Sequence, residues 1–145
     1  MTLSKWEDKD GNDDHGRGGS SSERRASLDR KEKESRAAGR NTDGKGSAAH
    51  LNAAISYSSA ENHEMHAGIA RGAGKDDKAT AHDAASSHHE QAGNAYHAAA
   101  TAYEAGKIGE GNARFKEGDI HAQAAHSSSD SAERTSRKSH TQEDA

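Results

Sequence analysis

Small side chains recur every seven residues between positions 81 and 108. Written in sevens, this stretch reads AHDAASS, HHEQAGN, AYHAAAT and AYEAGKI. Its fifth column holds only small residues, Ala85, Ala92, Ala99 and Gly106. Its second column holds only ring-bearing residues, His82, His89, Tyr96 and Tyr103. A seven-residue repeat is typical of a long helix that presents one face to a partner helix. The pattern therefore predicts a helix over about 77–105.

Two further segments show helical spacing. Small and apolar positions separated by alternating three- and four-residue steps predict a helix over 48–72. Gly72 and Gly74 then break the pattern, and a third helical segment is predicted around Phe115, after the weak stretch at Gly109 and Gly111. We therefore expect an all-α fold of two to three antiparallel helices, arranged as a helical hairpin array or a small bundle.

An internal repeat supports helical hairpins. An offset of 32 residues aligns 49–81 with 81–113 and matches Ala-Gly-Lys at 73–75 with the same tripeptide at 105–107. A period of this length is typical of stacked helical units. The segments YEAGKIGE (103–110) and FKEGDIHA (115–122) also resemble the inter-helix turn of tetratricopeptide repeats. That resemblance implies a helix-turn-helix array that serves as a docking surface for other proteins, although the closing proline of the repeat is absent.

Composition limits what the chain can bury. Of the residues that make up its 29% hydrophobic fraction, 28 are alanine, and the 145-residue sequence contains no Val, Pro or Cys. So few large apolar side chains make a stable monomer doubtful, because conformational entropy opposes folding. Glycine, serine and charged residues dominate positions 1–46. We therefore expect a disordered arm over 1–46, an Ala/His-rich helical domain over 47–137 and a disordered tail over 138–145.

Charge and targeting features exclude several classes. The net charge is −4 with acids and bases interspersed, which is not the electrostatic pattern of a nucleic-acid-binding domain. Residues 24–40 are mildly basic and leave a nucleic-acid accessory role as an alternative. The motif Arg-Arg-Ala-Ser-Leu makes Ser27 a candidate phosphosite for basophilic kinases. No apolar run is long enough for a membrane span and no signal-peptide core is found, so we expect a cytoplasmic protein, with packaging into a particle left open.

Histidines are the main candidate for chemistry. His63 and His66 lie three residues apart on one predicted helix, and His82, His88 and His89 lie close together on the next. Neutral imidazoles with such spacing bind zinc, nickel or copper, although histidine is also a polar filler tolerated in helices. His63-Glu64-Met65-His66 misses the H-E-x-x-H protease spacing by one residue, and no phosphate loop is found. These motif failures predict a non-enzymatic protein without a cofactor, and zinc or nickel binding by the histidines is left open.

The sequence therefore favours a helical interaction or structural protein, an accessory component of a larger assembly of the bacterial or phage type. A His-rich metal-binding or buffering protein is the alternative. Self-association or a protein partner is expected, with no membrane contact. The predicted partner-contact face consists of the apolar and small residues on the helical stripes: Leu51, Ile55, Met65, Ile69, Ala85, Ala92, Tyr96, Ala99, Tyr103, Phe115 and Ile120.

Overall fold

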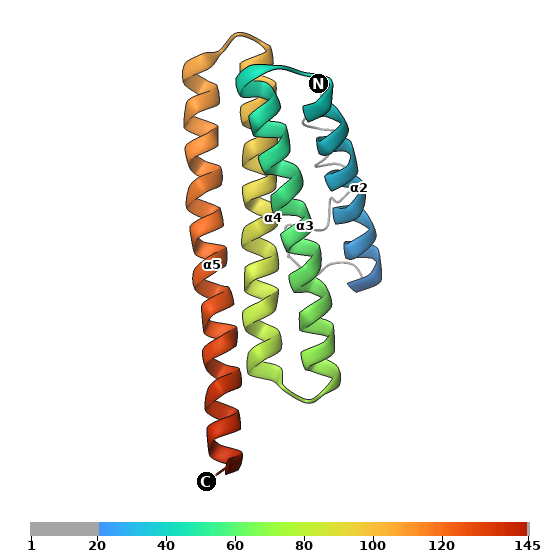
Figure 1. Ribbon diagram of the computed structural model, residues 1–145, viewed down its shortest axis with the longest axis vertical. Helices are drawn as coiled ribbons and strands as arrows, with labels where there is room; N and C mark the ends of the chain where they lie inside the picture. Colours follow the sequence, from blue (N-terminus) through green and yellow to red (C-terminus); the bar gives the residue numbers. More distant parts are fainter. Residues whose placement is uncertain (1–20, 145) are drawn as a thin grey trace.

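Four α-helices make up residues 21–144, the part of the chain that the computed structural model describes. They are α2 (Ser21–Arg40), α3 (Gly44–Gly72), α4 (Asp76–Glu104) and α5 (Ile108–Asp144). Each helix runs antiparallel to the next, and short turns join their ends (Figure 1). The all-α prediction is confirmed, whereas the prediction of two to three helices is too low. None of the helices in the described part combines the length and hydrophobicity that a bilayer crossing requires.

The 32-residue repeat corresponds to one long helix plus one turn. Helices α3, α4 and α5 begin 32 residues apart, and α3 and α4 are both 29 residues long. The two Ala-Gly-Lys turns have the same backbone geometry, with φ of 76° at Gly74 and 78° at Gly106. The Lys75 N–H donates to the Ala70 carbonyl at 2.8 Å, and the Lys107 N–H donates to the Ala102 carbonyl at 2.9 Å. These bonds close a glycine-dependent helix C-cap. Residues 103–110 therefore contain a turn, whereas 115–122 lie inside α5.

The seven-residue pattern of α4 marks its buried face. Ala85, Ala92 and Ala99 are fully buried, and Tyr96 is 5% exposed. Alanine columns allow neighbouring helices to approach closely, and larger side chains fill the remaining space. One apolar cluster combines Leu28, Ala53, Tyr57, Ala60, Ala92 and Tyr96. A second combines Ala49, Ala99 and Ala100, and Phe115 packs against both clusters.

Every tyrosine of the chain lies over a glycine of the following helix. Tyr57 lies over Gly93, Tyr96 over Gly118 and Tyr103 over Gly111. Each tyrosine hydroxyl donates to the residue after that glycine, at 2.6 Å to Asn94, 2.5 Å to Asp119 and 2.7 Å to Asn112. The absent Cβ provides room for the ring, and the polar neighbour satisfies its hydroxyl. This repeated contact fixes the axial register of α3 on α4 and of α4 on α5.

The predicted disordered arm is wrong for residues 21–46. Residues 21–40 form α2, and 44–46 already belong to α3. Leu28 of α2 is fully buried in the core, and Arg24 and Lys31 are 6% and 2% exposed. The charges of α2 form ion pairs with partners on α3 and α4, so a segment that looks like a solvated tail is part of the bundle. Residues 1–20 lie outside the described part.

The predicted C-terminal tail is also corrected. Helix α5 continues through Asp144, past the expected boundary at residue 137. Side chains are described to residue 134, except at 132. The segment contains no proline and no glycine after Gly118 that would end the helix. The backbone can therefore continue the 37-residue helix without interruption.

Candidate functional site

Five histidines from three helices converge at one end of the bundle. They are His63 and His66 of α3, His82 and His89 of α4, and His126 of α5. Ring centroids lie 5.2 Å apart for His63 and His82, and 5.4 Å apart for His66 and His82. His89 stacks on His63 at 5.4 Å and meets the edge of His126 at 5.9 Å. We call these five residues the histidine cluster.

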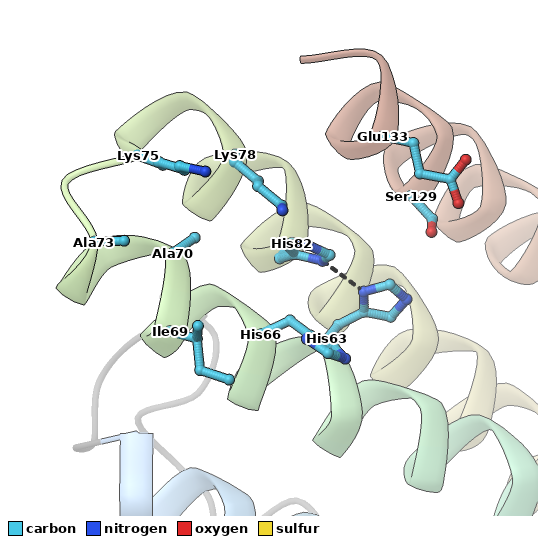
Figure 2. A pocket seen from close by; sticks show the side chains of 10 residues that line it. All are labelled: His63, His66, Ile69, Ala70, Ala73, Lys75, Lys78, His82, Ser129 and Glu133. Carbon is cyan, nitrogen blue, oxygen red and sulfur yellow. Dashed lines mark hydrogen bonds between the residues drawn. The ribbon is translucent and has the colours of Figure 1, made fainter. Parts of the chain in front are cut away.

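The closest contact in the histidine cluster joins two helices directly. The Nδ1 atoms of His63 and His82 lie 2.9 Å apart, so one neutral ring donates its N–H and the other accepts (Figure 2). These rings border an open cavity of about 560 Å³. Its lining residues come from α3, α4 and α5 and the turn between the first two: His63, His66, Ile69, Ala70, Ala73, Lys75, Lys78, His82, Ser129 and Glu133. The cluster is therefore reachable from solvent.

A short first helix explains why this end of the bundle is open. Arg24 lies near the start of α2 and is the point at which α2 meets Glu64 and Glu90. Beyond this layer, α3 and α4 run on to their turn without α2 beside them, as Figure 1 shows. His63 and His89 directly precede these two glutamates in the sequence. The histidine cluster thus begins at the layer where α2 starts.

A buried network of charged side chains lies next to the histidine cluster, where α2 meets α3 and α4. Arg24 donates from Nε to Glu64 at 2.9 Å and from Nη1 to Glu90 at 2.6 Å. Lys31 Nζ contacts the second Glu90 oxygen at 3.2 Å. Ser86 Oγ lies 3.3 Å from Arg24 Nη2 and donates to the Ala60 carbonyl at 2.8 Å. Two cations and two carboxylates balance, which is the condition under which charges are tolerated in a core.

Burial keeps the central imidazoles neutral. Loss of solvation lowers the pKa of His63 to about 4, and proximity to His82, His66 and His126 lowers it further in the same direction. Loss of solvation likewise lowers the pKa of His89 to about 4, with His63 as the next cause. The pKa of His82 is lowered mainly by burial as well. Neutral imidazole is the form that accepts a hydrogen bond or binds a metal ion.

These lowered pKa values predict a loss of stability in mild acid. Well above pH 6.5 His63 and His89 are neutral in both the folded and unfolded states, so they add no pH dependence there. Between pH 6.5 and 4 the unfolded chain takes up protons that the folded chain does not, and the free energy of unfolding falls. At pH 5 we expect a loss of about 1–2 kcal/mol for each ring, after allowance for partial exposure.

Urea unfolding at pH 7.5 and pH 5 measures this loss. The variant that carries His63→Gln and His89→Gln should lose less stability between these pH values than the wild type. His121→Gln is the matched control, because the ring contacts of the cluster do not include His121, and this variant should lose more stability between the two pH values than the double variant does. An unchanged slope in the double variant would contradict the assignment.

The sequence located most of the cluster. Four of the five predicted metal ligands, His63, His66, His82 and His89, lie together in the structure. The fifth, His88, makes no ring contact with them among the described residues, and its Nδ1 is buried. His126 joins instead. The histidine nearest to it in sequence, His121, lies five residues earlier, a spacing that does not place both rings on one helix face, and only the path of α5 beside α4 brings His126 to the cluster.

The contact predicted by the seven-residue pattern is made within the chain. Four residues of the predicted face contact other helices of the same chain and are buried: Ala85, Ala92, Tyr96 and Ala99. Three are half-buried: Met65, Tyr103 and Phe115. Four stay exposed, at 37% for Leu51, 57% for Ile55, 62% for Ile69 and 57% for Ile120. Association with a partner remains a prediction for this exposed group.

The structure shows the surroundings of two predictions for residues 24–40, the nucleic-acid contact and the phosphosite, which both stay predictions. Arg24 and Lys31 are engaged in the buried network, and other bases of α2 pair along the helix, such as Lys33 with Asp29 at 2.9 Å. A helix whose cations are already paired has less charge to offer a phosphate backbone. Ser27 is half-buried in α2, so recognition of the Arg-Arg-Ala-Ser-Leu motif would require α2 to leave the bundle.

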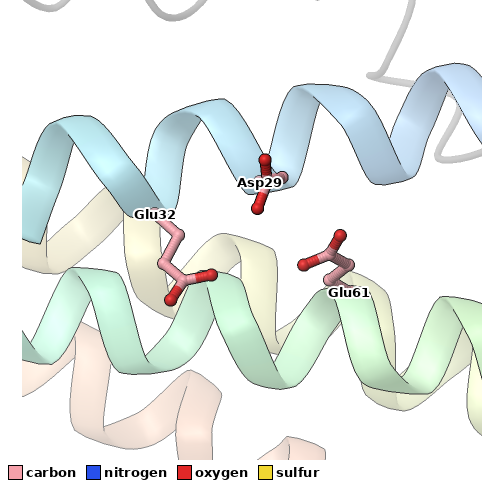
Figure 3. A group of neighbouring side chains, drawn as sticks. All are labelled: Asp29, Glu32 and Glu61. Carbon is pink, nitrogen blue, oxygen red and sulfur yellow. The ribbon is translucent and has the colours of Figure 1, made fainter.

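Three carboxylates also lie close together, and ion pairs within α2 already engage two of them. Oxygens of Asp29, Glu32 and Glu61 lie within 4.8 Å of one another (Figure 3). Two of these side chains are already neutralised, because Lys33 contacts Asp29 at 2.9 Å and Arg36 contacts Glu32 at 2.8 Å. Burial, and then repulsion by Asp29, raises the pKa of Glu61. These contacts explain the trio as part of the ion pairs along α2.

Comparison with protein-family models, with curated proteins and with solved structures finds no match to this chain. Function must therefore be inferred from the residues themselves. Among the described residues, the histidine cluster combines chemistry that can hold a ligand with access to solvent. It is the strongest candidate site.

Proposed function

We propose that the protein binds a divalent late transition-metal ion, zinc or nickel, through the histidine cluster. The observation that carries this proposal is the convergence of imidazoles from different helices, with His63 and His82 in direct contact. His66 lines the same cavity, and the ring of His89, which stacks on His63 and meets His126, adds further nitrogen donors nearby; the rings would have to turn for three nitrogens to reach one ion. The protein would act as a metal-binding or buffering protein, without catalysis.

The spacing of the rings supports a metal centre. In a tetrahedral zinc site, metal–nitrogen bonds of about 2.0–2.1 Å place imidazole centroids roughly 5 Å apart. The His63–His82 and His66–His82 centroids lie 5.2 and 5.4 Å apart. The Nδ1 atoms of His63 and His82 now share a hydrogen bond, and small side-chain rotations would turn both nitrogens to a common ion.

The surroundings favour reversible binding. The rings are neutral at pH 7, so an ion need not displace protons from His63 or His89. Histidine without cysteine suits zinc, nickel and copper(II) better than softer ions, and the chain contains no cysteine. Two cations, Lys75 and Lys78, and one carboxylate, Glu133, also line this cavity. The site is open to water, which would supply the remaining coordination positions and allow the ion to exchange.

Calorimetric titration of the full chain with zinc chloride and with nickel chloride tests the proposal. The double variant His63→Gln, His82→Gln should bind at this site at least about 100-fold more weakly, because even outer-shell changes cost 10- to 100-fold. His88→Gln is the matched control, since His88 lies next to His89 in sequence but not in the cluster. Equal loss in the control and the double variant, or no heat in the wild type, would contradict the proposal.

A further inference from the structure

The large aliphatic side chains of α3 lie on the side that faces solvent. All leucines, isoleucines and methionines of this helix follow one stripe: Leu51, Ile55, Met65 and Ile69. Met65 is half-buried and the other three are exposed. The buried face of α3 consists instead mainly of alanines, such as Ala53 and Ala60. Hydrophobic burial favours the opposite order, so a row of large apolar side chains left outside marks a surface that another molecule covers.

The exposed face of α3 also carries no Asp, Glu, Lys or Arg between positions 51 and 69. Its exposed residues there are Leu51, Ile55, Asn62, His66, Gly68 and Ile69. The two acids of this stretch are turned to α2, where Glu64 pairs with Arg24 and Glu61 lies next to two carboxylates (Figure 3). In a chain in which 30% of residues are charged, an uncharged exposed face of this length is unusual for a solvated surface. It fits burial against another uncharged face.

Helix α2 borders this stripe and leaves it open. A Cβ at Gly39 of α2 would lie 2.8 Å from the Leu51 side chain, so the two helices meet at this end of the stripe. At the other end, Ile69 lies past the layer of Arg24 and Glu64, where α3 runs on without α2 beside it (Figure 1). Helix α4 packs on the alanine face. The stripe is therefore covered by neither neighbour of α3.

The stripe has the spacing and the residue types of a two-stranded coiled coil. In heptad notation the contact is made by a and d positions: Ile55, Asn62 and Ile69 are a positions, and Leu51, Ser58 and Met65 are d positions. Isoleucine at a with leucine at d favours two parallel helices. A single asparagine at a selects a partner with the same residue in register, because one amide can donate to another and accept from it. The pattern therefore matches an identical helix.

We propose that this stripe binds the same stripe of a second copy of the chain, with the two α3 helices parallel and Asn62 facing Asn62. A second copy brings the same uncharged face, so the contact buries no unpaired charge. From Leu51 to Ile69 the stripe is roughly 27 Å long, and a helix pair of this length buries on the order of 1,200 Å² in total, the low end for stable interfaces. The dimer is therefore reversible. None of the stripe residues belongs to the histidine cluster, so the dimer is independent of metal binding.

Sedimentation of the full chain over a wide range of concentrations, with a metal chelator present, tests this contact. The wild type should form dimers as its concentration rises. The aspartate variant, Ile55→Asp with Ile69→Asp, should dimerise at least about 100-fold more weakly, because each dimer loses four apolar side chains and gains four buried carboxylates. Ile120→Asp is the matched control: Ile120 is as exposed as Ile55, at 57%, but lies on α5 beside the exposed charges of Lys116 and Glu117. Circular dichroism of dilute samples should be the same for all three proteins.

A cysteine variant tests the register of the pair. The chain contains no cysteine, so Asn62→Cys introduces a single thiol. In the parallel pair the two thiols face each other, and an added oxidant should link them in a disulfide. Glu117→Cys, at an exposed position of α5, is the control and should stay largely unlinked under the same conditions.

The outcomes separate a second copy from other occupants of the stripe. A dimer that is lost in the aspartate variant, kept in Ile120→Asp and linked in Asn62→Cys supports the proposal. A dimer that persists in the aspartate variant, or that forms only without the chelator, overturns it, and a dimer that Asn62→Cys does not link overturns the parallel register. A chain that is monomeric at every concentration also overturns it. In that case a red shift in the fluorescence of Trp6, the only tryptophan of the sequence, in the aspartate variant would show that residues 1–20 cover the stripe.

Discussion

Replacing Arg24 with methionine is expected to lower the free energy of unfolding by about 3–5 kcal/mol, the usual cost of breaking a buried ion pair by removing one partner. The guanidinium of Arg24 joins Glu64 on α3 to Glu90 on α4, and both carboxylates are nearly inaccessible. Without it, Glu64 loses its ion pair with α2, and Glu90 keeps its contact with Lys31 at 3.2 Å. Folded domains are stable by only about 5–15 kcal/mol, so this loss is a large share of the total.

The loss should appear first in α2. Leu28 is the only large apolar side chain of α2 that is fully buried in the described structure, and the other buried positions of this helix are polar or glycine. The helix is thus held largely by its charges. We expect the Arg24→Met variant to lose helical circular dichroism that corresponds to about the 20 residues of α2, before the other helices unfold.

Two comparisons make the Arg24 experiment specific. Arg25→Met changes the exposed neighbour and should alter stability by less than about 0.5 kcal/mol. A variant in which apolar residues of similar size replace all four charges of the buried network should recover most of the lost stability, because the cost arises from unpaired buried charge. These four residues are Arg24, Lys31, Glu64 and Glu90. A single Arg24→Met variant as stable as the Arg25→Met control would show that the ion pairs do not hold α2.

Gly93→Ala is expected to destabilise the protein by about 1–3 kcal/mol, the range for overpacking a core. A Cβ at Gly93 would lie 2.6 Å from the ring of Tyr57. This ring cannot move aside easily, because Tyr57 is fully buried and its hydroxyl is bonded to Asn94. Helix α4 would have to move away from α3, which would also disturb the register that the contact fixes.

Gly68→Ala provides the opposite control. Gly68 lies within α3, and a Cβ there would meet nothing within 4 Å among the described residues. Alanine is the better helix former, so this change should stabilise the protein by about 0.5–1 kcal/mol. Urea unfolding of both variants measures the difference. A Gly93→Ala variant that is more stable than the wild type would mean that Tyr57 does not pack on Gly93 as described.

The chain's local patterns determined its long helices. The heptads at 81–108 located α4 and its buried alanine face, because side chains seven residues apart return to the same side of a helix. The repeated Ala-Gly-Lys located both long turns, since glycine accepts the positive φ that a helix C-cap requires. The same local spacing grouped His63 with His66. Periodicity and turn chemistry act over a few residues, and that is why they can be recognised in the sequence.

The tertiary structure alone decided which polar residues belong to the core. Arg24 pairs with glutamates 40 and 66 residues away, and a charged serine-rich segment carries no local sign of those partners. His126 meets His89 only because α5 runs back along α4. The alanine-rich helices are thin enough to approach closely, so polar and aromatic groups distant in sequence fill the space between them. The sequence therefore determined the three helices after residue 44, and the contacts between helices determined the place of α2, the buried charges and the complete histidine cluster.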